Sequence, residues 1–219
     1  ARLRSHLEDD PRKPPHAGFE THESETAMAK KKLPYDQKYY DPEIECLPRP
    51  ELEQLQLERL KEMVRWSYDN APYYKQAWDE AGVSPEDIHT LKDIEKFPFI
   101  DKKTERETQG VGSFFGGLCA VPEEDVVFMA TSSGSTGVPT MSPFTQEDFD
   151  LWQDTEARLF WQAGMRPTDR YVHGLNFALY VGGPDVIGAQ NLGATAIWVG
   201  AVPSDRLLFV LKHYQPTII

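Results

Sequence analysis

The stretch that decides the fold runs from residue 125 to residue 140. It reads Asp125-Val-Val-Phe-Met-Ala130 and continues as Thr131-Ser-Ser-Gly-Ser-Thr-Gly-Val-Pro-Thr140. The first part predicts a short buried strand, and the second predicts a loop with six hydroxyl side chains and two glycines in ten residues. Successive backbone N–H groups in such a loop form a concave anion site, to which serine and threonine hydroxyls add neutral donors. The sequence therefore predicts a polyphosphate site at this loop.

The residues after the loop refine this prediction. Pro139 and Pro143 disfavour a helix start before Thr145, so the phosphates would lie in a loop between two strands and not at a helix N-terminus. The loop is not a Walker A loop, because Val138 follows Gly137 where that motif requires lysine. A flexible surface turn is the alternative interpretation, since Ser/Gly-rich loops are common. The position at the carboxyl end of a buried strand favours a ligand site.

Working outward, strands and helices alternate after the loop. The spacing predicts a helix from a capping box at Thr145-Gln-Glu-Asp148 to about Gly164, and further strands and helices downstream. The expected strands begin near 171, 195 and 217, and the expected helices span 181–192 and 205–213. Upstream, residues 49–80 have a helical period that Ala71-Pro72 should break. The fold class is therefore α/β, with a helical opening segment followed by a βαβαβ, mainly parallel sheet.

Composition narrows the function classes. The 219 residues carry 23 Lys+Arg against 35 Asp+Glu, a formal net charge of −12, which argues against general nucleic-acid or anionic-membrane binding. No apolar run approaches the roughly 20 residues of a membrane span. Cys46 and Cys119 lie far apart without zinc spacing, so we expect a reduced, cytoplasmic protein.

The two ends are unlike the middle. Residues 1–27 lack apolar periodicity and hold three histidines without metal spacing, so we expect a disordered or non-native extension before Met28. The last residues, Gln215-Pro-Thr-Ile-Ile219, read as the opening of a buried strand. We therefore interpret 28–219 as the N-terminal part of a longer domain.

At the loop, Ser132-Ser-Gly-Ser-Thr-Gly-Val-Pro-Thr140 resembles the phosphate-binding loop of the adenylate-forming acyl-CoA synthetase superfamily. It is most similar to the phenylacetate-CoA ligase branch, whose loop has lysine where this chain has Val138. Similar segments flank the loop over roughly residues 33–219: Leu47–Leu57, Asn70–Tyr74, Leu91–Phe99, Ala120–Pro122, Gly182-Gly183 and Leu192-Gly193. The resemblance implies the N-terminal part of an AMP-binding domain, truncated before the C-terminal lid domain.

The resemblance also implies a reaction and its site. Such a ligase would use ATP and Mg²⁺ to convert an aryl or arylacetic carboxylate, such as phenylacetate, into an acyl-adenylate, and would then form the thioester with coenzyme A. The expected ATP phosphate-binding residues are Ser132, Ser133, Gly134, Ser135, Thr136, Gly137 and Thr140. Phe177 and Tyr180 could flank an aromatic acid, with Gly182 and Gly183 leaving room for a flat ring. We assign no metal ligand and no catalytic residue, and read His173 as a core or loop histidine.

Two other functions stay open at this point. The chain could adenylate another acceptor, as relatives that act on a deazaflavin cofactor do, or it could be a non-catalytic nucleotide-binding module. Val138 favours the module, because it removes a cation near the phosphates, whereas the aromatic residues around Phe177 favour the ligase. We expect the 219-residue chain alone to have negligible ligase activity, because the adenine-binding motif and the lid lysine lie downstream in the family. A homodimer is left open.

Overall fold

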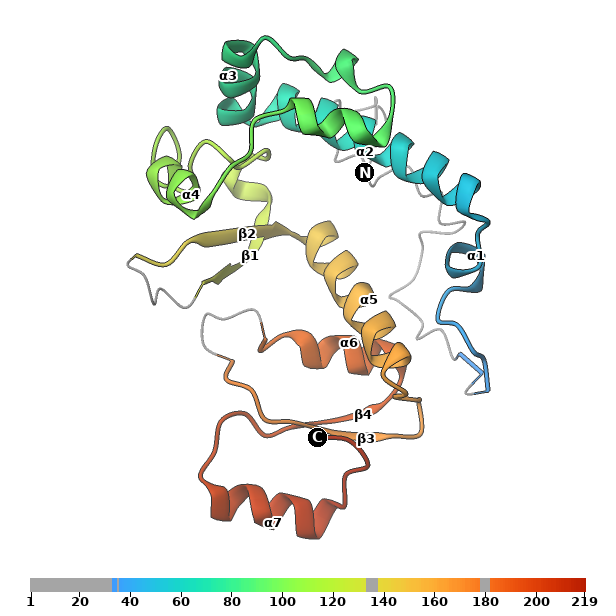
Figure 1. The fold of residues 1–219 in the computed structure, drawn as a ribbon. Helices are drawn as coiled ribbons and strands as arrows, with labels where there is room; N and C mark the ends of the chain where they lie inside the picture. Colours follow the sequence, from blue (N-terminus) through green and yellow to red (C-terminus); the bar gives the residue numbers. More distant parts are fainter. Residues whose placement is uncertain (1–32, 35, 133–137, 178–181) are drawn as a thin grey trace, which may run out of the picture. The chain divides into compact units, whose positions relative to one another are not determined.

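The computed structural model describes residues 33–34, 36–132, 138–177 and 182–219 (Figure 1). Its contacts divide the chain into two compact units. Within the described residues, the first unit spans 50–123, and the second combines 33–49 with the part of the chain after residue 123. Each unit has its own hydrophobic core, so each is described separately.

The first unit is helical. Helix α2 spans Arg49–Asn70 and α3 spans Pro72–Ala81, separated at Ala71 as the proline at position 72 predicts. Helix α3 ends at Gly82, which takes the left-handed conformation that terminates many helices. Val64, Trp78, Ile88 and Phe97 form the core between these helices and the segment that follows.

The remainder of the first unit consists of short elements. Two 3₁₀ helices, Pro85–Asp87 and Leu91–Lys96, each begin with a capping box. Helix α4 spans Lys102–Thr108, and its N-terminus is capped by the side chain of Asp101. A glycine-rich segment from residue 110 to residue 117 follows, and a 3₁₀ turn, Glu123–Asp125, leads out of the unit.

The second unit contains both strand pairs found in the described residues. After the short helix α1 (Pro42–Glu45), strands β1 (Val126–Thr131) and β2 (Met141–Thr145) form an antiparallel hairpin. The capping box predicted at Thr145 is present and starts helix α5 (Gln146–Gln162). The prediction of a loop between two strands is confirmed for the residues that flank it.

The parallel part of the unit follows α5. Strand β3 (Arg170–His173) pairs in parallel with β4 (Thr195–Trp198), and Ile218 adds a parallel bridge to Tyr171. Helix α6 (Asp185–Leu192) and helix α7 (Ser204–Tyr214) lie on opposite sides of this pair in Figure 1. The core joins α5, α6 and the residues just before β4, and its buried members are Leu33, Ala157, Trp161, Met165, Ala189, Leu192 and Ala194.

The predicted α/β class is confirmed, with two refinements. The β1–β2 hairpin is antiparallel and separate from the β3–β4 pair, so the parallel character resides in the second strand pair. Helix α6 begins at Asp185, four residues later than expected, because Gly182, Gly183 and Pro184 form a turn first. No helix within the described residues combines the length and the apolar character that a bilayer crossing requires.

Candidate active site

The hairpin closes tightly where the hydroxyl-rich loop begins and ends. Thr131 and Met141 form the last residue pair of the ladder, and Ser132 and Thr140 lie next to it. The N–H of Ser132 donates to the carbonyl of Thr140 at 3.0 Å, and the N–H of Thr140 donates to the Oγ of Ser132, also at 3.0 Å. We call this pair of residues the neck. It holds the two ends of the loop at a fixed separation.

The neck accounts for two of the seven predicted phosphate-binding residues. The Ser132 hydroxyl accepts a backbone hydrogen bond, and Thr140 is buried, so both residues have a structural part in holding the loop. The other five, Ser133, Gly134, Ser135, Thr136 and Gly137, lie outside the described residues. Val138 just beyond them is 70 % exposed. A side chain at that position therefore reaches the solvent beside the loop.

An aromatic cluster packs the β1–β2 hairpin against helix α5. Phe128 of β1 and Phe144 of β2 pack against Phe149 and Trp152 of α5, with ring centroids 5.0 to 6.0 Å apart. Because these rings come from both strands and from the next helix, they fix the hairpin against α5. The neck is thus anchored on a packed base and not on a free ribbon.

The second predicted region lies at the carboxyl ends of β3 and β4. His173 and Trp198 are the last residues of these strands and pair with each other in the parallel register. Phe177 packs over both: its ring is 5.2 Å from that of His173, and 5.4 Å from that of Trp198 with an interplanar angle of only 7°. We call Phe177 and Trp198 the aromatic shelf. Ligands of open α/β sheets bind at this end of the strands.

The two glycines of this region lie close to neighbouring residues. A Cβ on Gly183 would lie 2.8 Å from the Cα of Phe177 and 3.1 Å from the carbonyl oxygen of Asn176. A Cβ on Gly182 would lie 3.0 Å from the Cδ1 of Leu175. Gly183 therefore permits the backbone after β3 to pack against the turn before α6, with Phe177 beside it, and room for a ligand ring next to Gly182 and Gly183 stays a prediction. Tyr180 lies outside the described residues.

Two polar side chains of β3, one half-buried and one buried, lie next to the shelf. The Tyr171 hydroxyl and the Nδ1 of His173 are 3.1 Å apart, and the His173 side chain is fully buried. Burial lowers the pKa of His173, an effect that the nearby Gly183 backbone partly offsets, so its neutral form is favoured. Among the described residues, the Nε2 of His173 has no hydrogen-bond partner. The structure thus agrees with the interpretation of His173 as a core histidine.

A pair of acidic side chains lies between α5 and α6. Burial, with a smaller contribution from the negative charge of Glu156, raises the pKa of Asp185 to about 6. Burial also raises the pKa of Tyr171, and both carboxylates add to that effect. Asp185 is therefore protonated in a substantial fraction of molecules near pH 6.

Trp198 is the residue of this region that the sequence did not reveal. A tryptophan in a four-residue strand carries no motif, and its partner Phe177 is 21 positions away in the chain. The sequence did contain one indication of it: a large aromatic residue directly before Val199-Gly200, at the end of an expected strand, which is where open α/β sheets bind ligands.

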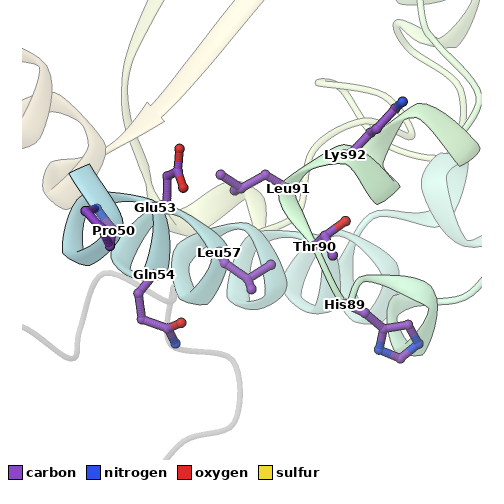
Figure 2. A pocket seen from close by; sticks show the side chains of 8 residues that line it. All are labelled: Pro50, Glu53, Gln54, Leu57, His89, Thr90, Leu91 and Lys92. Carbon is purple, nitrogen blue, oxygen red and sulfur yellow. The ribbon is translucent and has the colours of Figure 1, made fainter.

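A separate hollow of about 460 Å³ lies in the first unit (Figure 2). It is formed between the first turns of α2 and the segment that leads into the 3₁₀ helix at Leu91, and it contains none of the predicted site residues. Its lining residues are Pro50, Glu53, Gln54, Leu57, His89, Thr90, Leu91 and Lys92. Within the described part of the chain, no three His, Cys, Asp or Glu side chains gather closely enough to hold a metal ion there or elsewhere.

Comparison with known proteins identifies the relatives of this chain. It is 35 % identical over 181 residues to a phenylacetate-coenzyme A ligase of Thermus thermophilus, and 37 % identical over 177 residues to the enzyme of that name from Escherichia coli K12. The chain is homologous to the phenylacetate-coenzyme A ligases. These matches cover 82 % and 80 % of this chain. The resemblance inferred from the loop and its flanks is confirmed.

Solved structures support the same assignment. The fold of this phenylacetate-CoA ligase homologue matches 2-hydroxyisobutyryl-CoA ligase in the postadenylation state, in complex with 2-HIB-AMP, with a TM-score of 0.78 and 30 % identity over 84 % of this chain. The same ligase with 2-HIB-AMP and CoA in the thioesterification state matches with a TM-score of 0.78 and 31 % identity. No protein-family model matches the sequence. The chain spans about 40 % of the length of these relatives.

Proposed function

We propose that the complete protein containing this chain is an ATP-dependent acid–CoA ligase that acts on an aryl or arylacetic carboxylate such as phenylacetate. The observation that carries the proposal is the 35–37 % identity to four phenylacetate-CoA ligases over about four fifths of the chain. The structural relative with bound 2-HIB-AMP supports a route through an acyl-adenylate, and its complex with CoA supports transfer to that thiol.

In this proposal the neck serves the adenylation step. Attack of the carboxylate on the α-phosphate of ATP expels pyrophosphate, so negative charge increases on the departing group. Donors already fixed in place stabilise such charge without reorganising during the reaction. The two hydrogen bonds between Ser132 and Thr140 hold the ends of the loop whose N–H and hydroxyl groups would receive the pyrophosphate. The neck thus positions the loop, and the loop binds the phosphates.

The family's reaction also uses Mg²⁺, which would offset phosphate charge when bound. The described residues offer no cluster of acidic or histidine ligands for this ion, so we assign it no ligand and no step in this chain. The proposed catalytic contribution of the chain is limited to holding the phosphates and the acid.

The proposal is tested by pyrophosphate release from ATP in the complete protein, with phenylacetate, benzoate and 2-hydroxyisobutyrate as acids. We expect release that requires both ATP and the acid, fastest with an aromatic acid, and a CoA thioester identified by mass spectrometry. An adenylate that is passed to an acceptor other than CoA would favour the second kind of adenylating enzyme. Absence of release with every acid would contradict the ligase.

One observation favours a non-catalytic nucleotide-binding module as the second candidate. Val138, which stands where the phenylacetate branch has lysine, is exposed beside the loop and offers the phosphates no charge. Val138→Lys should lower the KM for ATP if the loop binds the triphosphate, because a cation would then face the phosphates. Tight ATP binding without turnover in the unmodified protein would support the module. A homodimer and a cytoplasmic location stay predictions.

A further inference from the structure

The indole of Trp198 stacks on Phe177 at the end of β4 and stays half exposed. Trp198 ends β4 beside His173 at the end of β3, where parallel strands offer ligands their carboxyl ends. His173 is fully buried at that edge, yet the Trp198 side chain is 50 % exposed. A large aromatic group is thus presented outward at the edge of the sheet where a substrate would bind.

Phe177 is 42 % exposed, and two neighbouring rings pack against it. One face of its ring lies parallel to the indole, at 5.4 Å between centroids. The ring of His173 packs against it at 5.2 Å with a tilt of 52°, and a Cβ on Gly200 would lie 3.4 Å from its Cε2. The exposed aromatic surface at this strand end is therefore shared by Phe177 and the indole stacked on it.

The shelf is held by backbone contacts. The carbonyl of His173 accepts hydrogen bonds from the N–H groups of Val199 at 3.1 Å and Gly200 at 3.0 Å, which fixes the turn after Trp198. Gly200 adopts a positive φ of 69° in that turn. Because the main chain sets the turn on one side of the shelf, and Gly183 packs against Phe177 on the other, the indole has a defined orientation.

We propose that Trp198 is a specificity-determining residue, whose indole packs against the ring of an aromatic acid while Phe177 acts as the positioning residue behind it. This inference rests on the proposed function, because it concerns the acid that the ligase would activate. Aromatic rings attract one another in offset or edge-to-face geometries, beyond the gain from buried area. A site built this way favours an aryl ring over a flexible alkyl chain.

The test compares two acids in Trp198→Leu, Trp198→Phe and the unmodified complete protein. We expect Trp198→Leu to lower kcat/KM for phenylacetate about tenfold more than kcat/KM for hexanoate, because leucine keeps apolar bulk without the aromatic interaction. Trp198→Phe should keep most of the preference for phenylacetate, and the KM for ATP should stay unchanged in both variants. Phe99→Ala, which removes an exposed ring of the first unit, is the matched control and should leave the preference intact.

Equal losses for the two acids would overturn the inference, as would a rise in the KM for ATP with no change in the KM for phenylacetate. If Trp198→Leu does not fold, as judged by its thermal unfolding, Trp198→Met replaces it with an unbranched apolar side chain. If the unmodified protein turns over no acid, the proposed function fails separately. Saturation-transfer NMR then decides the inference: transfer to the phenylacetate ring that persists without the indole overturns it, and its loss supports it.

Discussion

The neck and the aromatic shelf belong to the same unit but are built in different ways. The neck joins residues eight positions apart, and its hydrogen bonds are local to one hairpin. The shelf joins Phe177 and Trp198, and it exists only because β3 and β4 pair in one register. The difference teaches that a binding loop can be recognised from a short sequence, whereas a specificity surface requires the three-dimensional arrangement.

The largest effect is expected from substitutions in the loop that the neck holds. Replacing Ser135 and Thr136 together with alanine in the complete protein should slow adenylation about 100-fold, as removal of a preorganised donor to a developing charge does in other enzymes. The KM for the acid should change much less, because the acid-binding surface that we propose is the shelf and not the loop. Acid-dependent exchange of pyrophosphate into ATP measures the first effect. An unchanged exchange rate would remove the loop from the mechanism.

The shelf should be most sensitive at Gly183. Gly183→Ala places a methyl group 2.8 Å from the Cα of Phe177, so the backbone must shift, and we expect the free energy of unfolding to fall by about 1–3 kcal/mol. Gly174→Ala is the matched control, because its Cβ would meet no atom within 4 Å. Thermal unfolding of both variants measures the difference. Equal stability would show that the close approach at Gly183 carries no constraint.

The neck should respond more mildly. Ser132→Ala removes the acceptor of the Thr140 N–H and should lower the free energy of unfolding by about 1 kcal/mol, the usual net value of one hydrogen bond. The same change should slow adenylation modestly, because only the backbone hydrogen bond from the Ser132 N–H to the Thr140 carbonyl then holds the loop ends. Ser142→Ala, at an exposed position of β2, is the control. A decrease in stability without any effect on adenylation would separate the neck from the site.

The smallest effect concerns the acid pair behind the shelf. Because the pKa of Asp185 is raised to about 6 from 3.8, the folded state retains a proton that the unfolded state has lost, and stability should fall as pH rises from about 4 to 6. Asp185→Asn should flatten this part of the pH profile. Compared with the unmodified protein, the variant should therefore gain stability at pH 7 relative to pH 4.5. Thermal unfolding across that range measures it. Parallel profiles for the two proteins would contradict the raised pKa.

Local chemistry explains what the sequence predicted well. Proline at position 72, the capping box at Thr145 and the glycine at 193 each act within a few residues, so the helix boundaries they set were found. The start of α6 was misplaced because the apolar period continues through Val181, whereas Pro184 and Asp185 set the first turn. The strand expected at 217–219 is reduced to one bridge at Ile218 within the described residues.

In the candidate site, too, local features were predicted from the sequence and long-range contacts were not. The loop was predicted from its own hydroxyls and glycines, and its flanks confirm the hairpin that should carry it. The role of Phe177 in lining the pocket stays a prediction, and the sequence could not show that Trp198 stacks on one face of its ring. The covering residue, Trp198, depends on strand register, which no residue near Phe177 encodes.

The carbonyl of His173 accepts two backbone hydrogen bonds, and this bears on how the acid specificity of the protein can change. The bend after β4 is tied down by peptide groups, and none of those ties passes through the indole. The side chain at position 198 can therefore be substituted without loss of these backbone hydrogen bonds. A single substitution at position 198 would then change the side chain offered to the acid while the backbone that carries it stays in place.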